Sequence, residues 1–456
     1  MGSLVDTYIE TNQDRFLDEL KEFLTIPSIS TLPQHRPDIE RASEFVAQKL
    51  RDAGMEKVER ISNGGHPLVY GEWLGAPGKP TVLCYGHYDV QPPDPLDEWT
   101  TPPFEPAVRN QNIYARGAAD DKGQMYIHLK AVESLLTTRG SLPMNVKFLI
   151  EGEEEVGGAA VDKHVKEHPE NLSADVVLVS DTEMFAPGLP TLCIGLRGLI
   201  YTELVATGAA QDLHSGLFGG AAPNPLMGLV RIISQLVSPE HRVLVPGFYD
   251  DVATPTPREK SSWTQLPFDE KKFLDEVGSP GLIGEAGFGV LERLWARPTL
   301  EVHGIVGGFM GEGGKTVIPA KASAKVSMRL VPRQNPEKVL EAFCNEVKRL
   351  TPPALRVQIK VLSSGEPVLM DPSHPLIQAA AQALTATFHR PTVFTRSGGS
   401  IPIVSRFRDS LGAPVVLMGF GLPDDRLHAP NEKFYLPNFF DGIRAVGLFW
   451  ENLGKQ

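Results

Sequence analysis

Short apolar runs alternate with helix-periodic segments in the first part of the chain. The runs 81–85, 145–151 and 175–181 are rich in Val, Leu and Ile, which is typical of strands buried on both faces. Helical segments are predicted at 38–53 and 123–140, and a polar helix is predicted near 159–168. Alternation of this kind predicts an α/β domain with a mainly parallel sheet.

The pattern changes near residue 195. The runs 194–208 and 321–332 alternate like strands, whereas 225–237 and 336–350 are helical, and this mixture predicts a small α+β domain with an antiparallel sheet. Residues 238–300 form a Pro-rich stretch without clean periodicity. The α/β pattern returns in helices 374–388 and 438–454 and strand 413–421. We therefore expect one α/β domain, residues 1–194 and 368–456, interrupted by an inserted α+β domain, residues 195–367.

Composition and charge exclude several classes of protein. The 456 residues carry a formal charge of −12 and no basic cluster, so we expect neither a nucleic-acid nor a membrane partner. No apolar stretch approaches the roughly 20 residues that span a bilayer, and no secretion signal is visible at the N-terminus. Three widely separated cysteines, Cys84, Cys193 and Cys344, fit free thiols in a reducing compartment. The sequence predicts a cytoplasmic protein.

Side chains that can bind metal follow the ends of the predicted strands. These side chains are His87 and Asp89, Asp120, Glu151 to Glu155, Asp181 and His428. An acid at a strand end is often only a helix cap, but the carboxyl ends of parallel strands meet at one edge of a sheet. Histidines with carboxylates suit Zn²⁺, Mn²⁺ or Co²⁺, and this set is large enough for two ions that share a ligand.

Seven motifs resemble those of the M20 metallopeptidases, most closely the cytosolic dipeptidase and carnosinase branch. They are YGHYDVQP, RGAADDKGQ, EGEEEVGG, VSDTE, DLHSGLFGG, SGGSIP and LHAPNEKF, and they occur in the family's order across nearly the whole chain. One such motif would mean little, whereas the ordered set is specific. The resemblance implies that the α/β domain is catalytic and that the inserted domain is a lid and dimerisation domain.

The resemblance also implies a role for individual residues. His87 and Asp181 would bind one divalent ion, Glu155 and His428 a second, and Asp120 would bridge both. Glu154 would be the general base that activates the water between the ions, and Asp89 would fix the His87 tautomer. The ions would be Zn²⁺, with Mn²⁺ or Co²⁺ as alternatives.

Further residues would contact the substrate. His214 would reach into the neighbouring subunit's site and stabilise the oxyanion, which implies a homodimer formed through the inserted domain. Arg329 would bind the substrate's terminal carboxylate, and the backbone of Gly398, Gly399 and Ser400 would line the same pocket. The resemblance thus implies hydrolysis of dipeptides or short peptides with a free C-terminus.

Two alternatives remain open at this stage. A deacylase of N-acyl or N-carbamoyl amino acids would use the same chemistry, and a non-catalytic peptide-binding relative is the second. The dipeptidase branch usually has an acid where this chain has Ser397, which puts strict dipeptide specificity in doubt. Residues 164–168, HVKEH, fit an inverted zinc-protease pattern, but we interpret them as a solvated helix end because the segment lacks an apolar face.

Overall fold

The computed structural model describes residues 4–455, which divide into two compact units. Among the described residues, unit 1 comprises 4–194, 370–395 and 403–455, and unit 2 comprises 195–369 and 396–402. Residues 368–369 and 396–402, which we had placed in the α/β domain, fall in unit 2.

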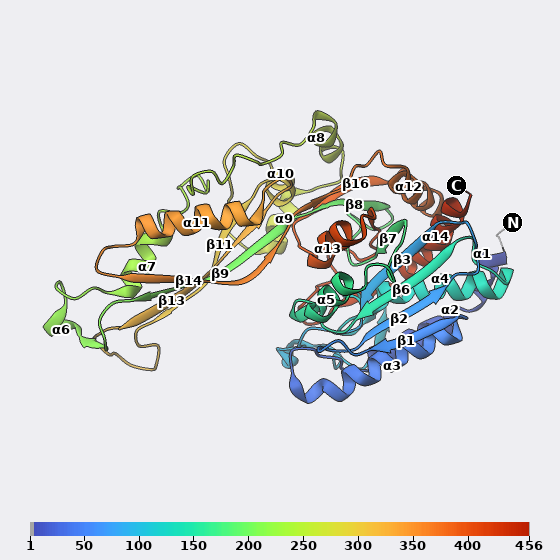
Figure 1. The fold of residues 1–456 in the computed structure, drawn as a ribbon, viewed down its shortest axis with the longest axis horizontal. Coiled ribbons are helices and arrows are strands. Elements are labelled where there is room, and N and C mark those ends of the chain that lie inside the picture. Colours follow the sequence, from blue (N-terminus) through green and yellow to red (C-terminus); the bar gives the residue numbers. More distant parts are fainter. Residues whose placement is uncertain (1–3, 456) are drawn as a thin grey trace. The chain divides into compact units, whose positions relative to one another are not determined.

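Unit 1 contains a mixed sheet with a parallel centre (Figure 1). Its strands are ordered β1 (Lys57–Ile61), β2 (Leu68–Trp73), β6 (Asn145–Glu151), β3 (Thr81–His87), β7 (Val176–Val179), β17 (Val415–Leu417) and β8 (Thr191–Leu196). β6, β3, β7 and β17 run parallel, whereas β1, β2 and β8 pair antiparallel. The sheet continues through β15 (Val368–Leu369), and β16 (Val393–Ser397) also pairs with β8. The predicted α/β class is confirmed.

Helices cover both faces of this sheet, which explains why its central strands are apolar throughout. Neighbouring residues of a strand point to opposite faces. Tyr85 of β3 meets Phe407 of α13 (Pro402–Leu411) edge to face at 5.4 Å, whereas a side chain at Gly86 would meet Met125 of α4 (Lys122–Arg139). The remaining helices of unit 1 are α1 (Leu4–Thr11), α2 (Gln13–Leu24), α3 (Arg36–Asp52), α5 (Ala159–Glu167), α12 (Pro375–Phe388) and α14 (Leu436–Gly454).

Unit 2 is built on an antiparallel sheet ordered β11 (Thr299–Gly307), β13 (Lys321–Leu330), β9 (Gly198–Thr207) and β14 (Arg356–Gly365). The helices α7 (Pro225–Ile233) and α11 (Pro336–Leu350) bury Ile232 and Phe343 against Leu204 and Met328 of this sheet. Residues 238–300 are more regular than we expected, because they contain the short helices α8 (Pro257–Thr264), α9 (Glu270–Val277) and α10 (Val290–Ala296).

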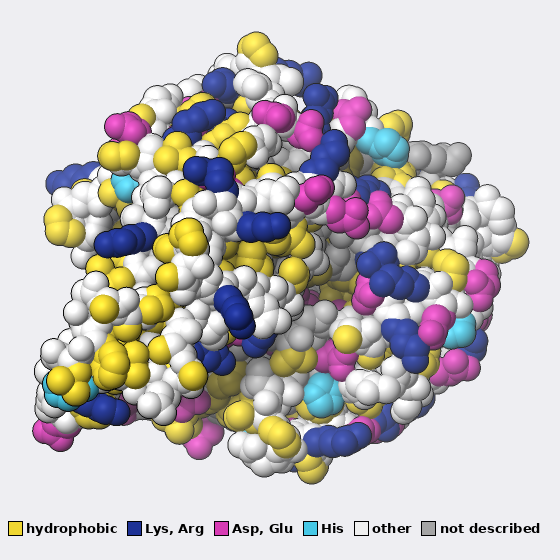
Figure 2. Space-filling view, turned by 60° about the vertical axis from the view of Figure 1, so that its left-hand side comes forward, with side chains coloured by type: hydrophobic (Ala, Val, Ile, Leu, Met, Phe, Trp, Pro, Cys, Tyr) yellow, Lys and Arg dark blue, Asp and Glu magenta, His cyan; other side chains and the backbone are white. Residues whose placement is uncertain are grey.

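Charge is dispersed over the face that Figure 2 shows. Lys and Arg side chains lie singly among Asp, Glu and apolar side chains rather than in one basic field. Within residues 4–455, no helix is both long enough and apolar enough to cross a bilayer.

Candidate metal centre

The carboxyl ends of three parallel strands bring polar side chains to one edge of the sheet. β3 ends at His87 and β6 at Glu151, and these two residues are paired across the strands. β7 ends at Val179, two residues before Asp181. The loop before α4 adds Asp120, the turn after β6 adds Glu155, and the segment after β17 adds His428.

These side chains form two clusters that share Asp120. His87, Asp120 and Asp181 make the first, and Asp120, Glu155 and His428 make the second. In each, one candidate ligand atom from every residue lies within 4.8 Å of the others. Asp120 uses its two oxygens separately, because Oδ1 lies 3.1 Å from His87 Nε2 and Oδ2 lies 2.9 Å from His428 Nε2. The geometry is therefore that of a bridging carboxylate between two sites.

Asp89 orients the imidazole of His87, a member of the first cluster. His87 Nδ1 lies 3.1 Å from the carbonyl oxygen of Asp89 and 3.4 Å from its carboxylate. Either acceptor favours the tautomer that leaves Nε2 free of a proton and available to a metal. The carbonyl makes the shorter contact, so both the main chain and the side chain of Asp89 are placed to fix the His87 tautomer.

The electrostatics of the clusters favour a bound cation. Burial raises the pKa of Asp181 well above its usual range, and the charges of Asp120 and Asp121 raise it further. Burial and the neighbouring carboxylates also raise the pKa of Glu154 to about 7, although His87 opposes this. Hydrogen bonds to Asp120 and Glu155 raise the pKa of half-exposed His428 to about 10. Crowded carboxylates with two imidazoles are a donor set that fits borderline divalent ions such as Zn²⁺ or Mn²⁺.

Comparison with known proteins assigns the chain to a family. The chain matches Peptidase family M20/M25/M40 over residues 83–452. It is 33% identical to the Cys-Gly metallodipeptidase DUG1 of Candida albicans, with 99% of this chain and 97% of that protein covered. It is 31% identical to the Beta-Ala-His dipeptidase of Rattus norvegicus, with 98% and 94% covered. A solved structure, the M20 metallo-carboxypeptidase Sso-CP2 of Sulfolobus solfataricus, superposes with a TM-score of 0.88 at 32% identity and covers 97% of this chain and 99% of that one.

The chain belongs to the M20 peptidases. It is therefore a metallopeptidase by family, and the resemblance drawn from the motifs is confirmed. One solved M20 structure, the YXEP protein of Bacillus subtilis, is described as a dinuclear metal-binding peptidase, and this chain contains two groups of residues that could each hold a metal ion.

Unit 2 of this M20 chain brings Arg329 and the 397–400 segment together. Arg329 Nη1 donates to Ser400 Oγ at 2.8 Å, and Ser400 Oγ donates to the carbonyl of Arg197 at 2.5 Å. Arg197 Nε in turn donates to the carbonyl of Gly398 at 2.8 Å, and its amide donates to that of Gly399 at 3.0 Å. Arg197 is a residue that the sequence analysis missed, although it lies in the recognisable segment GLRG.

His214, also in unit 2, is exposed and has a defined orientation. It ends β10 (Leu213–His214) and precedes the short helix α6 (Ser215–Phe218). Its Nδ1 accepts the amide of Gly216 at 2.9 Å. The neutral ring must then carry its proton on Nε2, so the exposed nitrogen is a hydrogen-bond donor.

Two further residues contact the clusters and were missed from sequence. Gln91 lies within the motif YGHYDVQP and donates from Nε2 to Glu155 Oε2 at 2.7 Å. Glu432, within LHAPNEKF, accepts hydrogen bonds from the loop that carries Asp120. Both lie inside motifs that we had recognised, but neither has a local pattern that indicates its partner.

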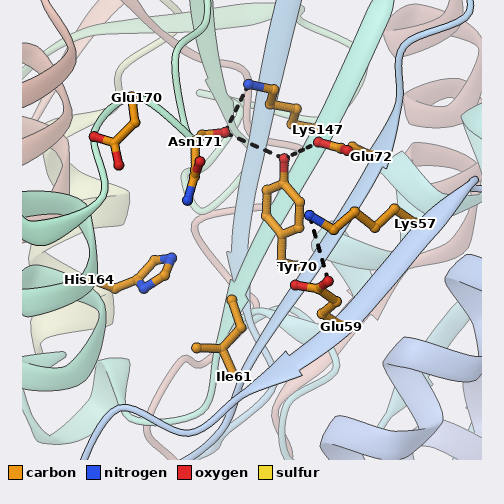
Figure 3. A pocket seen from close by; sticks show the side chains of 9 residues that line it. All are labelled: Lys57, Glu59, Ile61, Tyr70, Glu72, Lys147, His164, Glu170 and Asn171. Carbon is orange, nitrogen blue, oxygen red and sulfur yellow. Dashed lines mark hydrogen bonds and ion pairs between the residues drawn. The ribbon is translucent and has the colours of Figure 1, made fainter.

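His164, the first residue of HVKEH, lines a separate pocket of about 280 Å³ (Figure 3). His164 is buried on α5 beside Val161 and Val165, so our interpretation of this helix as lacking an apolar face was wrong. Other polar residues of this pocket hydrogen-bond to one another, since Lys147 donates to the Asn171 carbonyl at 2.8 Å. His164 joins neither of the metal clusters found among the described residues.

Proposed function

We propose that this M20 chain hydrolyses the peptide bond of dipeptides or short peptides that have a free C-terminus. The observation that carries the proposal is the pair of clusters joined by the two oxygens of Asp120. The relatives support the substrate class, because two of them are called dipeptidases and a third a carboxypeptidase.

Five side chains would hold the two divalent ions. His87 and Asp181 would bind one ion, Glu155 and His428 the other, and Asp120 both. Two bound ions supply Lewis-acid polarisation of the scissile carbonyl and lower the pKa of water between them. Zn²⁺ fits this donor set best, and Mn²⁺ and Co²⁺ also fit it.

Glu154 would move the proton. A general base works best when its pKa lies near the operating pH, and the pKa of Glu154 is raised to about 7. Its carboxylate would take a proton from the attacking water and deliver it to the leaving amine. Asp89 holds the main chain of this turn, because its carboxylate accepts the amides of Glu154 and Glu155 at 3.1 and 3.2 Å.

Arg329 and Ser400, with the main chain of Gly398 and Gly399, would bind the substrate's terminal carboxylate, and Arg197 would add a second positive charge. Burial and the charge of Arg329 lower the pKa of Arg197 to about 10. An anion bound beside both guanidiniums would relieve this repulsion. We further propose that His214 donates from Nε2 to the oxyanion in the partner subunit's site.

A homodimer formed through the inserted domain would place His214 in trans. The edge strand β11 offers an exposed apolar surface for such pairing, because Val302, Ile305 and Val306 are 39%, 40% and 52% exposed. Exposed edge strands are ready to pair with another chain. The cysteines Cys84, Cys193 and Cys344 are free, which supports the proposed cytoplasmic location.

A substrate panel tests the proposal. It compares a dipeptide with its C-terminal amide and with an N-acetyl amino acid, each assayed after either Zn²⁺ or Mn²⁺ is returned to apoenzyme. We expect the free dipeptide to be hydrolysed and the amide to lose most of its kcat/KM. Preferred hydrolysis of the N-acetyl amino acid would instead establish a deacylase, and no hydrolysis of any compound with either metal would indicate a peptide-binding relative.

A further inference from the structure

Glu432 lies completely buried against the loop that carries Asp120. Its Oε2 accepts from Arg116 Nη1 at 2.7 Å and from the amide of Gly117 at 3.0 Å. Its Oε1 accepts from the amides of Ala119 and Asp120 at 2.9 and 3.1 Å. All four donors belong to residues 116–120, so a single carboxylate fixes this loop from one end to the other.

The last of these donors matters most for the metal centre. Asp120 is the residue common to both clusters, and its side chain contacts His87 on one side and His428 on the other. The Glu432 carboxylate accepts the backbone amide of Asp120 itself, the residue whose side chain is the bridging carboxylate. A shift of this main chain would therefore displace a ligand from both metal positions at once.

The segment that contains Glu432 also provides His428. Directly after Glu432, β18 (Lys433–Tyr435) pairs with β5 (Asn112–Tyr114), and the amide of Ala115 donates to the Glu432 carbonyl at 3.2 Å. One short stretch thus carries a member of the second cluster and positions the shared member of both.

A buried arginine–glutamate pair can also be a purely structural element. Arg116 has two further contacts that suit a structural role. Its Nη2 donates to the Pro92 carbonyl at 3.2 Å, and its guanidinium lies 5.5 Å from the Trp99 ring centre. The amides of Ala119 and Asp120 are different, since they connect Glu432 to the metal loop rather than to the surrounding core. Measuring metal affinity together with thermal stability distinguishes a role in positioning the metal loop from a purely structural role.

We propose that Glu432 is a positioning residue that sets the metal affinity of both clusters through the main chain of Asp120. This inference rests on the proposed di-metal function. Residues that orient metal ligands typically contribute 10–100-fold in metal affinity, and Glu432 acts on the ligand that the two ions would share.

The test uses two variants of Glu432 and one matched control. Glu432→Gln keeps the shape of the side chain, but its NH₂ group faces two N–H donors whichever way the amide is turned. Glu432→Asp keeps the charge but is one carbon too short to reach all four donors. The control is Glu285→Gln in unit 2, where Glu285 is also buried and accepts from Arg242 and Arg297 at 2.7–2.8 Å.

Mn²⁺ binding to each full-length protein is measured by equilibrium dialysis, and thermal unfolding is measured without metal. We expect both Glu432 variants to bind both ions about 10–100-fold more weakly than the wild type. Glu285→Gln should lose stability but keep wild-type affinity. Wild-type affinity in Glu432→Gln would overturn the inference. So would failure of both Glu432 variants to fold while Glu285→Gln folds, because Glu432 would then serve stability. A wild-type chain that binds neither Mn²⁺ nor Zn²⁺ in the same dialysis would overturn the proposed function itself.

Discussion

The carboxylate of Asp89 accepts the backbone amide of Glu154 at 3.1 Å. The two residues follow different strands, and the contact joins the ends of β3 and β6 at the edge where both clusters form. The second oxygen of Asp89 accepts the amide of Glu155 at 3.2 Å. The buried side chain of Asp89 therefore fixes the main chain of Glu154, the proposed base, and of Glu155, a proposed ligand. The Asp89 carbonyl in turn orients His87.

Replacing Asp89 by Asn should loosen this connection. Glu154 and Glu155 donate to separate oxygens of Asp89, so in the Asn variant an NH₂ group would face one of these two N–H donors. We expect metal affinity and kcat to fall roughly 10–100-fold, as measured by dialysis and by dipeptide hydrolysis. Asp269→Asn is the control, because Asp269 accepts two consecutive amides on a single oxygen at an exposed helix cap, so Asn can keep both hydrogen bonds. Equal behaviour of the two variants would contradict the role of Asp89.

Glu154 and Glu155 are adjacent, but their replacement should have different consequences. Glu154→Gln removes a base and should lower kcat by about 10²–10⁴ while both ions stay bound. Glu155→Gln weakens a ligand, so the purified protein should contain less metal. Metal content by elemental analysis and steady-state kinetics distinguish the two. Normal turnover by Glu154→Gln would show that the base has been assigned to the wrong residue.

The pH dependence of stability should reflect an ion-pair network between α2 and α4. Hydrogen bonds from Lys130, Tyr126 and Arg15 outweigh burial and lower the pKa of Glu19 from 4.5 to about 2. Because the folded-state pKa is the lower one, the contribution of Glu19 is fully present above pH 4.5. It is lost progressively as the pH falls toward 2.

The urea midpoint measured between pH 5.5 and 2.5 checks this contribution. Glu19→Gln should be less stable than the wild type at pH 5.5, and the difference should shrink as the pH falls. A constant difference over the whole range would contradict the assignment to Glu19.

The action of His214 in trans can be tested by mixing two inactive variants. His214→Ala should lose about 10²–10³ in kcat with its metals intact, and Glu154→Gln should be inactive for a different reason. If His214 completes the partner's site, a mixed dimer contains one site with both wild-type residues. Co-refolded mixtures should then regain activity that neither parent shows. An active monomer in sedimentation, or proven heterodimers that remain inactive, would rule out this role.

Local rules indicated which strand ends carry the candidate metal residues, and the resemblance to the family motifs selected the individual residues. His87 and Asp181 each come after an apolar run, and parallel strands bring such positions to one sheet edge. Glu432 could not be found in this way. Its partners lie 312–316 positions earlier in the chain, and a glutamate followed by a strand has many simpler explanations.

Parts of unit 2 were missed for a different reason. β11 and β14 are exposed over most of their length, and register shifts at Val302/Gly304 and at Val361/Ser363 interrupt the alternation of their side chains. The helix α8 carries a visible start signal, because Thr256 and Glu259 form a capping box around Pro257. The Pro-rich composition of residues 238–300 concealed that signal.

The number of divalent ions bound per chain tests the central claim most directly. Apoenzyme is prepared with a chelator, Zn²⁺ or Mn²⁺ is titrated back, and bound metal and dipeptide hydrolysis are followed together. We predict close to two ions per chain, with hydrolysis absent from the apoenzyme and restored as the ions bind. Asp120→Ala should lose both ions, because Asp120 contacts both clusters. Full hydrolysis by metal-free enzyme, or two tightly bound ions in Asp120→Ala, would contradict a co-catalytic centre bridged by Asp120.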